Sequence, residues 1–163
     1  EQANALKRHS VNLITVAQAL HWFDTGVLYA EANRVLKKHG LIACWSYKLF
    51  RINSEIDREI DRFYSDTLGK YWDPELRLVE TGYRTLSFPF REMRSPHFEM
   101  KATWNFDSMI GILGSWSAVA NFKKREGFDP VPEITDSLRS VWGNTGQTKE
   151  VCWELSMRLG RVF

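Results

Sequence analysis

Two continuous apolar runs near the start of the chain are separated by a segment with helical periodicity. Residues 10–19 (SVNLITVAQA) and 41–46 (LIACWS) are short and apolar, which is typical of buried strands. Between them, Asp24 can cap a helix, residues 37–38 (two lysines) suit its last turn, and Gly40 is expected to end it with a positive φ. A strand, a helix and a strand with short connections predict a βαβ unit with parallel strands.

After residue 47 the pattern becomes mainly helical. We expect one helix to begin at Ser54, a second over residues 74–79 and a third over residues 132–142. Another helix should run from a cap at Asp107 to about residue 127, with a bend at Gly111 and Gly114. Residues 97–104 are expected to form a strand. Residues 151–159 alternate between apolar and polar positions, which is the period of a strand. Their more polar face favours an antiparallel strand near a sheet edge.

The composition fits one globular domain without a strong electrostatic footprint. The chain has 163 residues, 44% of them hydrophobic, and its 22 Lys and Arg nearly balance its 20 Asp and Glu. We therefore expect neither nucleic acid nor a membrane surface as a partner. No apolar run reaches the roughly 20 residues that cross a bilayer, and no signal peptide is evident at the start, so a cytoplasmic location is expected.

The cysteines and histidines do not follow the spacing of a metal site. Cys44 and Cys152 lie far apart in apolar segments, and we interpret both as buried free thiols. The four histidines are also scattered along the chain, with no pair at helical spacing. The sequence therefore predicts no metal centre.

Four motifs, taken in order along the chain, carry a family resemblance. They are SVNLITVAQALHWFD (residues 10–24), EANRVLKKHGLIACWSY (residues 31–47), Tyr83 with FPF at residues 88–90, and LGSWS (residues 113–117). Together they resemble the class I S-adenosylmethionine-dependent methyltransferases, in particular the small-molecule group similar to trans-aconitate methyltransferase. Two departures are visible: Asn12 stands where the group usually has Asp, and residues 38–39 (Lys-His) replace its Pro-Gly.

The resemblance implies an α/β fold, the C-terminal part of a Rossmann-like seven-stranded sheet with parallel strands and an antiparallel last strand. Residues 1–163 would form a single partial domain. Residues 1–46 would be its βαβ portion, residues 47–131 a helical region on the acceptor side, and residues 132–163 a helix and the last strand. The family's glycine-rich turn and ribose-binding carboxylate are absent from these residues. We therefore expect the chain to be cut from a longer enzyme and to be inactive alone.

The resemblance also implies a cofactor, S-adenosylmethionine, and residues that contact it. Because ligands of open α/β sheets bind beyond the carboxyl ends of parallel strands, the donor would lie beside Gln18, Ala19, His21 and Trp22. Glu1 would be a remnant of the pair that contacts adenine. The alternative is that Gln18 and His21 only satisfy backbone groups of the turn and that Trp22 packs on the helix start.

The acceptor is expected to be a small molecule. His21 is a candidate catalytic base, since imidazole titrates near neutral pH, although a carboxylate acceptor would need no base. Trp116 and Ser117 are candidate substrate-binding residues, and Arg91 could pair with an acidic substrate. The alternatives are that Trp116 is core at helical spacing and that Arg91 is only solvated.

A second class of function competes with the enzyme. The seven tryptophans are compatible with a noncatalytic module that binds aromatic or sugar ligands. Most of them, however, occupy apolar faces or strand interiors, where packing explains them. The oligomeric state and the acceptor's identity are not predicted.

Overall fold

The computed structural model describes residues 5–163, and its contacts divide them into two compact units. Unit 1 contains residues 5–48, 75–99 and 154–163, and unit 2 contains residues 49–74 and 100–153. The mixed α/β fold predicted from the sequence is confirmed, with a five-stranded sheet and helices.

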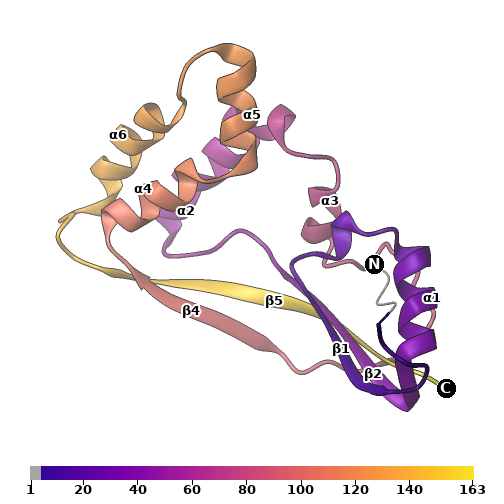
Figure 1. Cartoon of the computed structure of the whole chain (residues 1–163). Helices are drawn as coiled ribbons and strands as arrows, with labels where there is room; N and C mark the ends of the chain where they lie inside the picture. The colour runs from indigo at the N-terminus through magenta and orange to yellow at the C-terminus, as the bar shows by residue number, and fades with distance from the viewer. Residues whose placement is uncertain (1–4) are drawn as a thin grey trace. The chain divides into compact units, whose positions relative to one another are not determined.

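The predicted βαβ arrangement forms the start of unit 1. Strand β1 (Val11–Ala17) pairs in parallel with β2 (Leu36–Tyr47), and a short 3₁₀ turn, η1 (Leu20–Trp22), and helix α1 (Thr25–Val35) connect them. Figure 1 shows α1 beside this strand pair. As predicted, Asp24 caps α1, because its side chain accepts hydrogen bonds from the two amides of Gly26 and Val27.

The end of α1 differs from the prediction. The helix stops at Val35, and residues 37–38 already belong to β2 rather than to a last helical turn. The positive φ lies at His39 (64°), not at Gly40. Gly40 is needed for another reason: a Cβ there would come within 2.9 Å of the Lys37 carbonyl oxygen. The physical cause of the early stop is Leu36, which turns extended and becomes fully buried.

The last strand is antiparallel, as predicted, and it lies one strand from the sheet edge rather than at the edge itself. Strand β5 (Lys149–Arg161) pairs antiparallel with β2 on one side and with β3 (Arg91–Met93) on the other, in the order β1-β2-β5-β3. Strand β4 (Phe98–Trp104) also pairs with β5. The polar positions of β5 are compatible with this place because one of them, Arg158, makes hydrogen bonds within unit 1.

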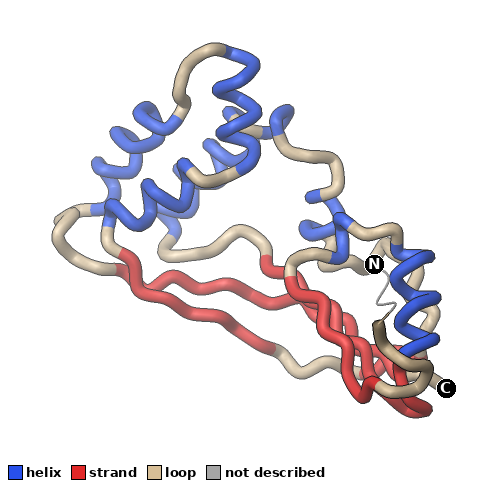
Figure 2. The backbone as a smooth tube through the Cα atoms, in the orientation of Figure 1, coloured by secondary structure: helices blue, strands red, loops and turns tan. Residues whose placement is uncertain are grey.

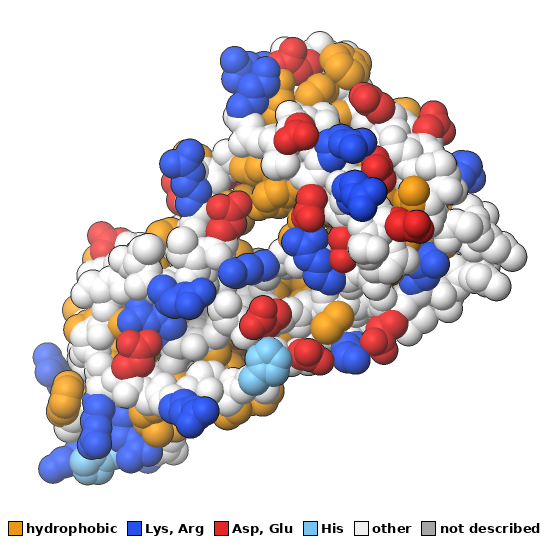
Figure 3. All heavy atoms as spheres, turned by 180° about the vertical axis from the view of Figure 1, so that it is seen from behind, with side chains coloured by type: hydrophobic (Ala, Val, Ile, Leu, Met, Phe, Trp, Pro, Cys, Tyr) orange, Lys and Arg blue, Asp and Glu red, His pale blue; other side chains and the backbone are white. Residues whose placement is uncertain are grey.

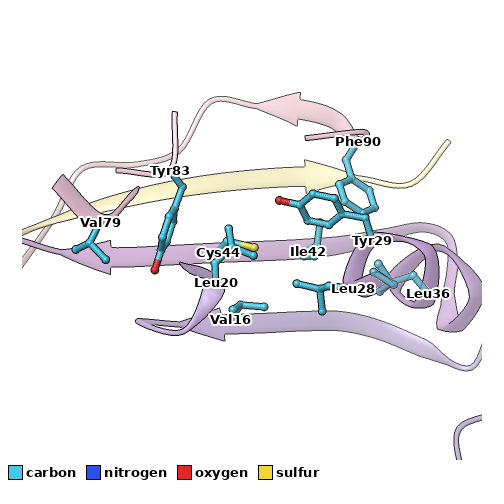
Figure 4. Packing of buried hydrophobic residues seen from close by; sticks show 11 residues of the cluster. Val16, Leu20, Leu28, Tyr29, Leu36, Ile42, Cys44, Val79, Tyr83 and Phe90 are labelled. Carbon is cyan, nitrogen blue, oxygen red and sulfur yellow. The ribbon is translucent and has the colours of Figure 1, made fainter. Parts of the chain in front are cut away.

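A single hydrophobic cluster holds unit 1 together (Figure 4). It joins one face of the sheet to α1, to η1 and to the short helix α3 (Leu76–Glu80). Its buried members are Val16, Leu20, Leu28, Tyr29, Ala32, Leu36, Ile42, Cys44, Val79, Tyr83 and Phe90. The cluster therefore fixes the segment after β1 and the segment around Tyr83 against the same strands.

Unit 2 is mainly helical (Figure 2). Its helices are α2 (Ser54–Arg62), the π-helical turn η2 (Phe63–Thr67), the 3₁₀ turn η3 (Gly69–Tyr71), α4 (Phe106–Gly114), α5 (Ser117–Glu126) and α6 (Val131–Trp142). Asn53 and Asn105 cap α2 and α4 with their side chains, so the predicted cap at Asp107 is wrong. Asn105 precedes the first helical residue and can accept from the Ser108 amide, whereas Asp107 already lies in the first turn.

Charged side chains of both signs are interspersed over the face in Figure 3, in keeping with the formal net charge of +2. A group of Lys, Arg and His side chains lies at its lower left end. Among residues 5–163, no helix combines the length and the apolar character that crossing a bilayer requires.

Candidate functional site

The carboxyl ends of β1 and β2 lie at one edge of the parallel pair, where Ala17 is in register with Trp45. Ligands of open α/β sheets bind at this edge. Four residues predicted from the sequence follow β1 directly: Gln18, Ala19, His21 and Trp22. The structure therefore brings them together at the edge where a ligand is expected, while Glu1 lies outside the described residues.

Gln18 fastens the two strand ends to each other. Its backbone is left-handed (φ 48°), and its amide donates to the Trp45 carbonyl at 2.8 Å. Its side chain accepts from the Tyr47 amide at 3.0 Å and donates to the Tyr47 carbonyl at 3.3 Å. These bonds continue the connection between the two strands beyond the pair of Ala17 and Trp45. The Gln18 side chain therefore binds backbone groups at the end of β2 rather than those of the turn, and a ligand contact by this side chain stays a prediction.

Ala19 precedes the short turn η1 and accepts a hydrogen bond from the Trp22 amide at 3.0 Å. The turn places Leu20 in the core and Trp22 on the surface, where Trp22 is 55% exposed. The indole of Trp22 contacts the His21 ring, with centroids 4.7 Å apart and planes tilted by 49°. An exposed aromatic face therefore lies next to a buried imidazole.

His21 is a buried polar residue in an otherwise apolar cluster. It is 6% exposed, and its Nδ1 lies 3.0 Å from the hydroxyl of Tyr83. Burial lowers the pKa of His21 below its usual 6.5, and the nearby Glu75 partly opposes the decrease. The imidazole is therefore neutral at pH 7, with one nitrogen protonated and the other an acceptor.

Tyr83 reaches His21 from a strained part of the chain. Gly82 and Tyr83 are both left-handed, with φ of 58° and 61°. Burial raises the pKa of Tyr83 to about 12, so the phenol keeps its proton at physiological pH. Figure 4 shows its ring reaching across the sheet close to Cys44 and Leu20.

Arg158 of β5 binds this strained segment through its backbone carbonyls. Its Nη1 donates to the carbonyls of Tyr83 at 3.0 Å and Leu86 at 2.7 Å, and its guanidinium pairs with both carboxylate oxygens of Glu92. The ring of Phe88 lies 4.4 Å from the same guanidinium. These contacts lower the pKa of Glu92. The segment from Tyr83 to Glu92 is thus anchored to the sheet by one side chain.

The candidate acceptor residues Trp116 and Ser117 belong to unit 2. Trp116 lies between α4 and α5, half-buried, and its ring contacts those of Phe63, Tyr64 and Trp72 at centroid distances of 6.2, 5.8 and 5.4 Å. The Ser117 hydroxyl donates to Asp73 at 3.1 Å. Arg91 is exposed in β3 of unit 1, in register with Arg161. Ligand contacts by these three residues stay predictions.

Sequence reasoning missed Tyr83 and Arg158 as parts of the site. Tyr83 was noted only as part of a family motif, and Arg158 only as a polar position in an alternating strand. Their contacts join residues 62 and 75 positions apart along the chain, which no local pattern reveals. The one local signal is the glycine at position 82, where the left-handed backbone begins.

Within residues 5–163, no group of three or more His, Cys, Asp or Glu side chains is arranged to hold a metal ion. Cys44 and Cys152 are free, with Cys44 buried and Cys152 half-buried. The side chains that the structure brings together near this edge are His21, Tyr83 and Trp22.

Comparisons with known proteins agree with this architecture. A candidate methyltransferase of Dictyostelium discoideum is 34% identical to this chain over 139 residues, which are 83% of this chain and 53% of that protein. A solved structure of a candidate type II methyltransferase from Anaeromyxobacter dehalogenans has 41% identity and a TM-score of 0.90, over 96% of this chain and 67% of that one. No protein family model matches the chain.

The parallel strand pair with its polar carboxyl edge, followed by an antiparallel strand in the same sheet, defines the chain as part of a Rossmann-like α/β fold of the methyltransferase type. The chain belongs to the class I S-adenosylmethionine-dependent methyltransferases. It spans about half the length of the curated relative that it matches. The narrower likeness to the trans-aconitate group stays a prediction.

Proposed function

We propose that the chain takes part in methyl transfer from S-adenosylmethionine to a small-molecule acceptor, with the donor bound at the carboxyl edge of β1. The observation that carries this proposal is the pairing of an exposed indole, Trp22, with a neutral buried imidazole, His21, at that edge. An α/β sheet offers its ligand site at this end of the strands.

The residues at the edge fit the chemistry of the donor. When bound, S-adenosylmethionine supplies a methyl group on a positively charged sulfur. An indole face attracts such a cation, and Trp22 is the exposed aromatic residue at this edge. The neutral imidazole of His21 adds no charge that would repel a sulfonium. Gln18 keeps the strand ends together, which holds the turn Leu20–Trp22 in a fixed place.

Three residues are proposed to contact the acceptor, and each is described within its own unit. Trp116 offers a half-buried ring at the junction of α4 and α5, and Ser117 offers a hydroxyl held by Asp73. Arg91, exposed in β3, would suit an acceptor with a negative charge. Positioning an acceptor near the methyl group and excluding water supply much of the rate in a displacement of this kind.

The chain alone is expected not to catalyse the reaction. No G-x-G-x-G turn occurs in its 163 residues, so the amides that would cradle the donor in this fold are not supplied by this sequence. We therefore expect isothermal titration of the chain with S-adenosylmethionine to show no binding in the micromolar range.

A chimera tests the proposal. In the Anaeromyxobacter protein, the matched segment is replaced by this chain, which aligns over 96% of its length. We expect micromolar binding of S-adenosylmethionine by the chimera, and about fivefold weaker binding after Trp22→Ala, since an exposed cation–π contact contributes about 1 kcal/mol. Phe128→Ala is the matched control, because Phe128 is equally exposed (59%) but lies in unit 2. A folded chimera whose affinity is unaffected by Trp22→Ala contradicts the proposed placement.

The noncatalytic module that binds aromatic or sugar ligands is not favoured. The aromatic rings of unit 2 pack on one another, and the two relatives are both candidate methyltransferases. Micromolar binding of a sugar or an aromatic compound by the chain alone would revive this alternative.

A further inference from the structure

The buried pair of His21 and Tyr83 has a defined direction of hydrogen bonding. Their two polar atoms are 3.0 Å apart, and both side chains are almost completely removed from solvent. One proton lies between them, supplied either by the phenol or by the imidazole Nδ1. Which group supplies it decides whether the other imidazole nitrogen, Nε2, carries a proton.

The phenol is the group that donates. Among the described residues, the Tyr83 hydroxyl has one hydrogen-bond partner, Nδ1 of His21, and Tyr83 is fully buried. If Nδ1 donated, the buried phenol proton would have no acceptor, which is costly. If the phenol donates to Nδ1 instead, both atoms are satisfied and the proton of the neutral imidazole lies on Nε2.

We infer that Tyr83 is a positioning residue that donates to His21 Nδ1 and thereby keeps the proton of the neutral imidazole on Nε2. His21 then presents an N–H donor to the ligand at the carboxyl edge, and it binds an oxygen such as a carboxylate. The inference rests on the proposed function for the presence of a ligand there, but the tautomer itself is a property of the chain without ligand.

The surroundings of Nε2 agree with this role. Nε2 makes no hydrogen bond within the described part of the chain, and it is not among the buried polar atoms that lack a partner there. It therefore has access to solvent, beside the exposed ring of Trp22. The charged group that acts on His21 is Glu75, and a carboxylate accepts from an N–H rather than donating to a nitrogen lone pair.

The strained backbone of Tyr83 is explained by the same role. A left-handed Tyr is unfavourable, and such a conformation persists only when its surroundings fix it. Arg158 fixes it by binding the Tyr83 carbonyl, and Ser156 crowds Gly82, where a Cβ would come within 2.7 Å. The arrangement orients the phenol toward His21, so we expect the strain to be retained for this hydrogen bond.

The nitrogen NMR spectrum of the isotopically labelled chain tests the tautomer directly. In the free chain near neutral pH, we expect the His21 signals of a neutral ring with the proton on Nε2 and an unprotonated Nδ1. A spectrum with the proton on Nδ1 overturns the inference. Because no donor or acceptor is present, this result is independent of whether the proposed methyl transfer is correct.

Two matched variants assign the effect to Tyr83. Tyr83→Phe removes the donated proton, and we expect His21 to lose its fixed tautomer and show averaged signals. Tyr29→Phe is the control, because Tyr29 is also buried in unit 1 but its hydroxyl has no partner among the described residues. Equal changes in both variants, or none in Tyr83→Phe, overturn the role of Tyr83. If Tyr83→Phe does not fold, the spectrum of the unaltered chain still shows which nitrogen of His21 carries the proton.

Acetate serves as the probe for the oxygen ligand. Titration of the labelled chain with sodium acetate is expected to shift the His21 Nε2–H signal, whereas sodium chloride at the same ionic strength leaves it unchanged. Equal shifts with both salts, or no shift with acetate, overturn the assignment of a carboxylate ligand. Failure of the donor to bind the chimera, with the tautomer confirmed, would instead count against the proposed function.

Discussion

The two units stabilise their large polar and aromatic side chains in different ways: unit 1 through hydrogen bonds, and unit 2 through contacts between rings. Unit 1 places His21, Tyr83 and Arg158 in or beside its core and pairs each with a group far away in the sequence. Unit 2 instead gathers rings, such as Tyr64, Trp72 and Trp116, whose contacts depend on shape. Unit 1 is therefore sensitive to protonation and to the loss of single partners, whereas unit 2 responds mainly to lost volume.

The largest expected effect is a cavity in unit 2. Trp142 is 2% exposed and packs on Phe106 at a centroid distance of 5.5 Å. Trp142→Ala should lower the free energy of unfolding by about 3–5 kcal/mol, because the core cannot refill so large a space. Trp22→Ala in unit 1 should change it by less than about 0.5 kcal/mol, since Trp22 is exposed. Urea unfolding measures the free energy of unfolding of both variants. Equal losses would contradict the placement of Trp142 in the core and of Trp22 on the surface.

Two arginines that each bind both oxygens of a carboxylate sharpen the comparison. Arg158 in unit 1 has a side chain 11% exposed, while Arg51 in unit 2, paired with Asp61, is 53% exposed. Arg158→Met should destabilise by about 2–3 kcal/mol, because two partly buried carbonyls lose their donor. Arg51→Met should cost less than about 1 kcal/mol. Thermal unfolding measures the loss of stability in both variants. A larger loss in Arg51→Met than in Arg158→Met would contradict this comparison.

Two glycines are expected to respond with opposite signs. A Cβ at Gly160 of β5 would come within 2.6 Å of the Phe90 Cβ, so Gly160→Ala should cost about 1–3 kcal/mol. Gly111 lies inside α4 with nothing within 4 Å of an added Cβ. Gly111→Ala should therefore stabilise by about 0.5–1 kcal/mol, the helix preference of Ala over Gly. Melting temperatures that fall in both variants would contradict this account of unit 2.

The last effect is a loss of stability that occurs only at alkaline pH and originates in unit 1. Burial raises the pKa of Cys44 from 9.0 to about 12, and that of Tyr83 from 10.0 to about 12. The folded-state pKa values are the higher ones, so stability is complete below pH 9 and declines as the unfolded chain ionises first. For Cys44 alone we expect about 1 kcal/mol per pH unit above 9. Cys44→Val should flatten this part of the profile, and an unchanged slope would exclude Cys44 as the cause.

The sequence allowed the local elements to be predicted but not the long-range partners. The strand before Gln18, the Asp24 cap and the helix over residues 132–142 follow from periodicity and capping, and the structure confirms them. The helix end near Gly40 failed because burial of Leu36 outweighed the glycine signal.

The candidate site was predicted only in part, for the same physical reason. Its position after β1 follows from the order of strand, turn and helix. The hydrogen bond from Tyr83 to His21 and the clamp by Arg158 depend on β5 pairing with β2, a contact between opposite ends of the chain. The alternation of apolar and polar residues in β5 predicts a strand, but it does not predict which strands pair with it.

The most direct test of the central claim is amide hydrogen exchange of the chimera with and without S-adenosylhomocysteine, the demethylated form of the donor. We predict slower exchange at residues 18–22 when the ligand is bound, with little change in α6. Unchanged exchange at residues 18–22, while another part of this chain becomes protected, would contradict the placement of the methyl donor at the carboxyl edge of β1.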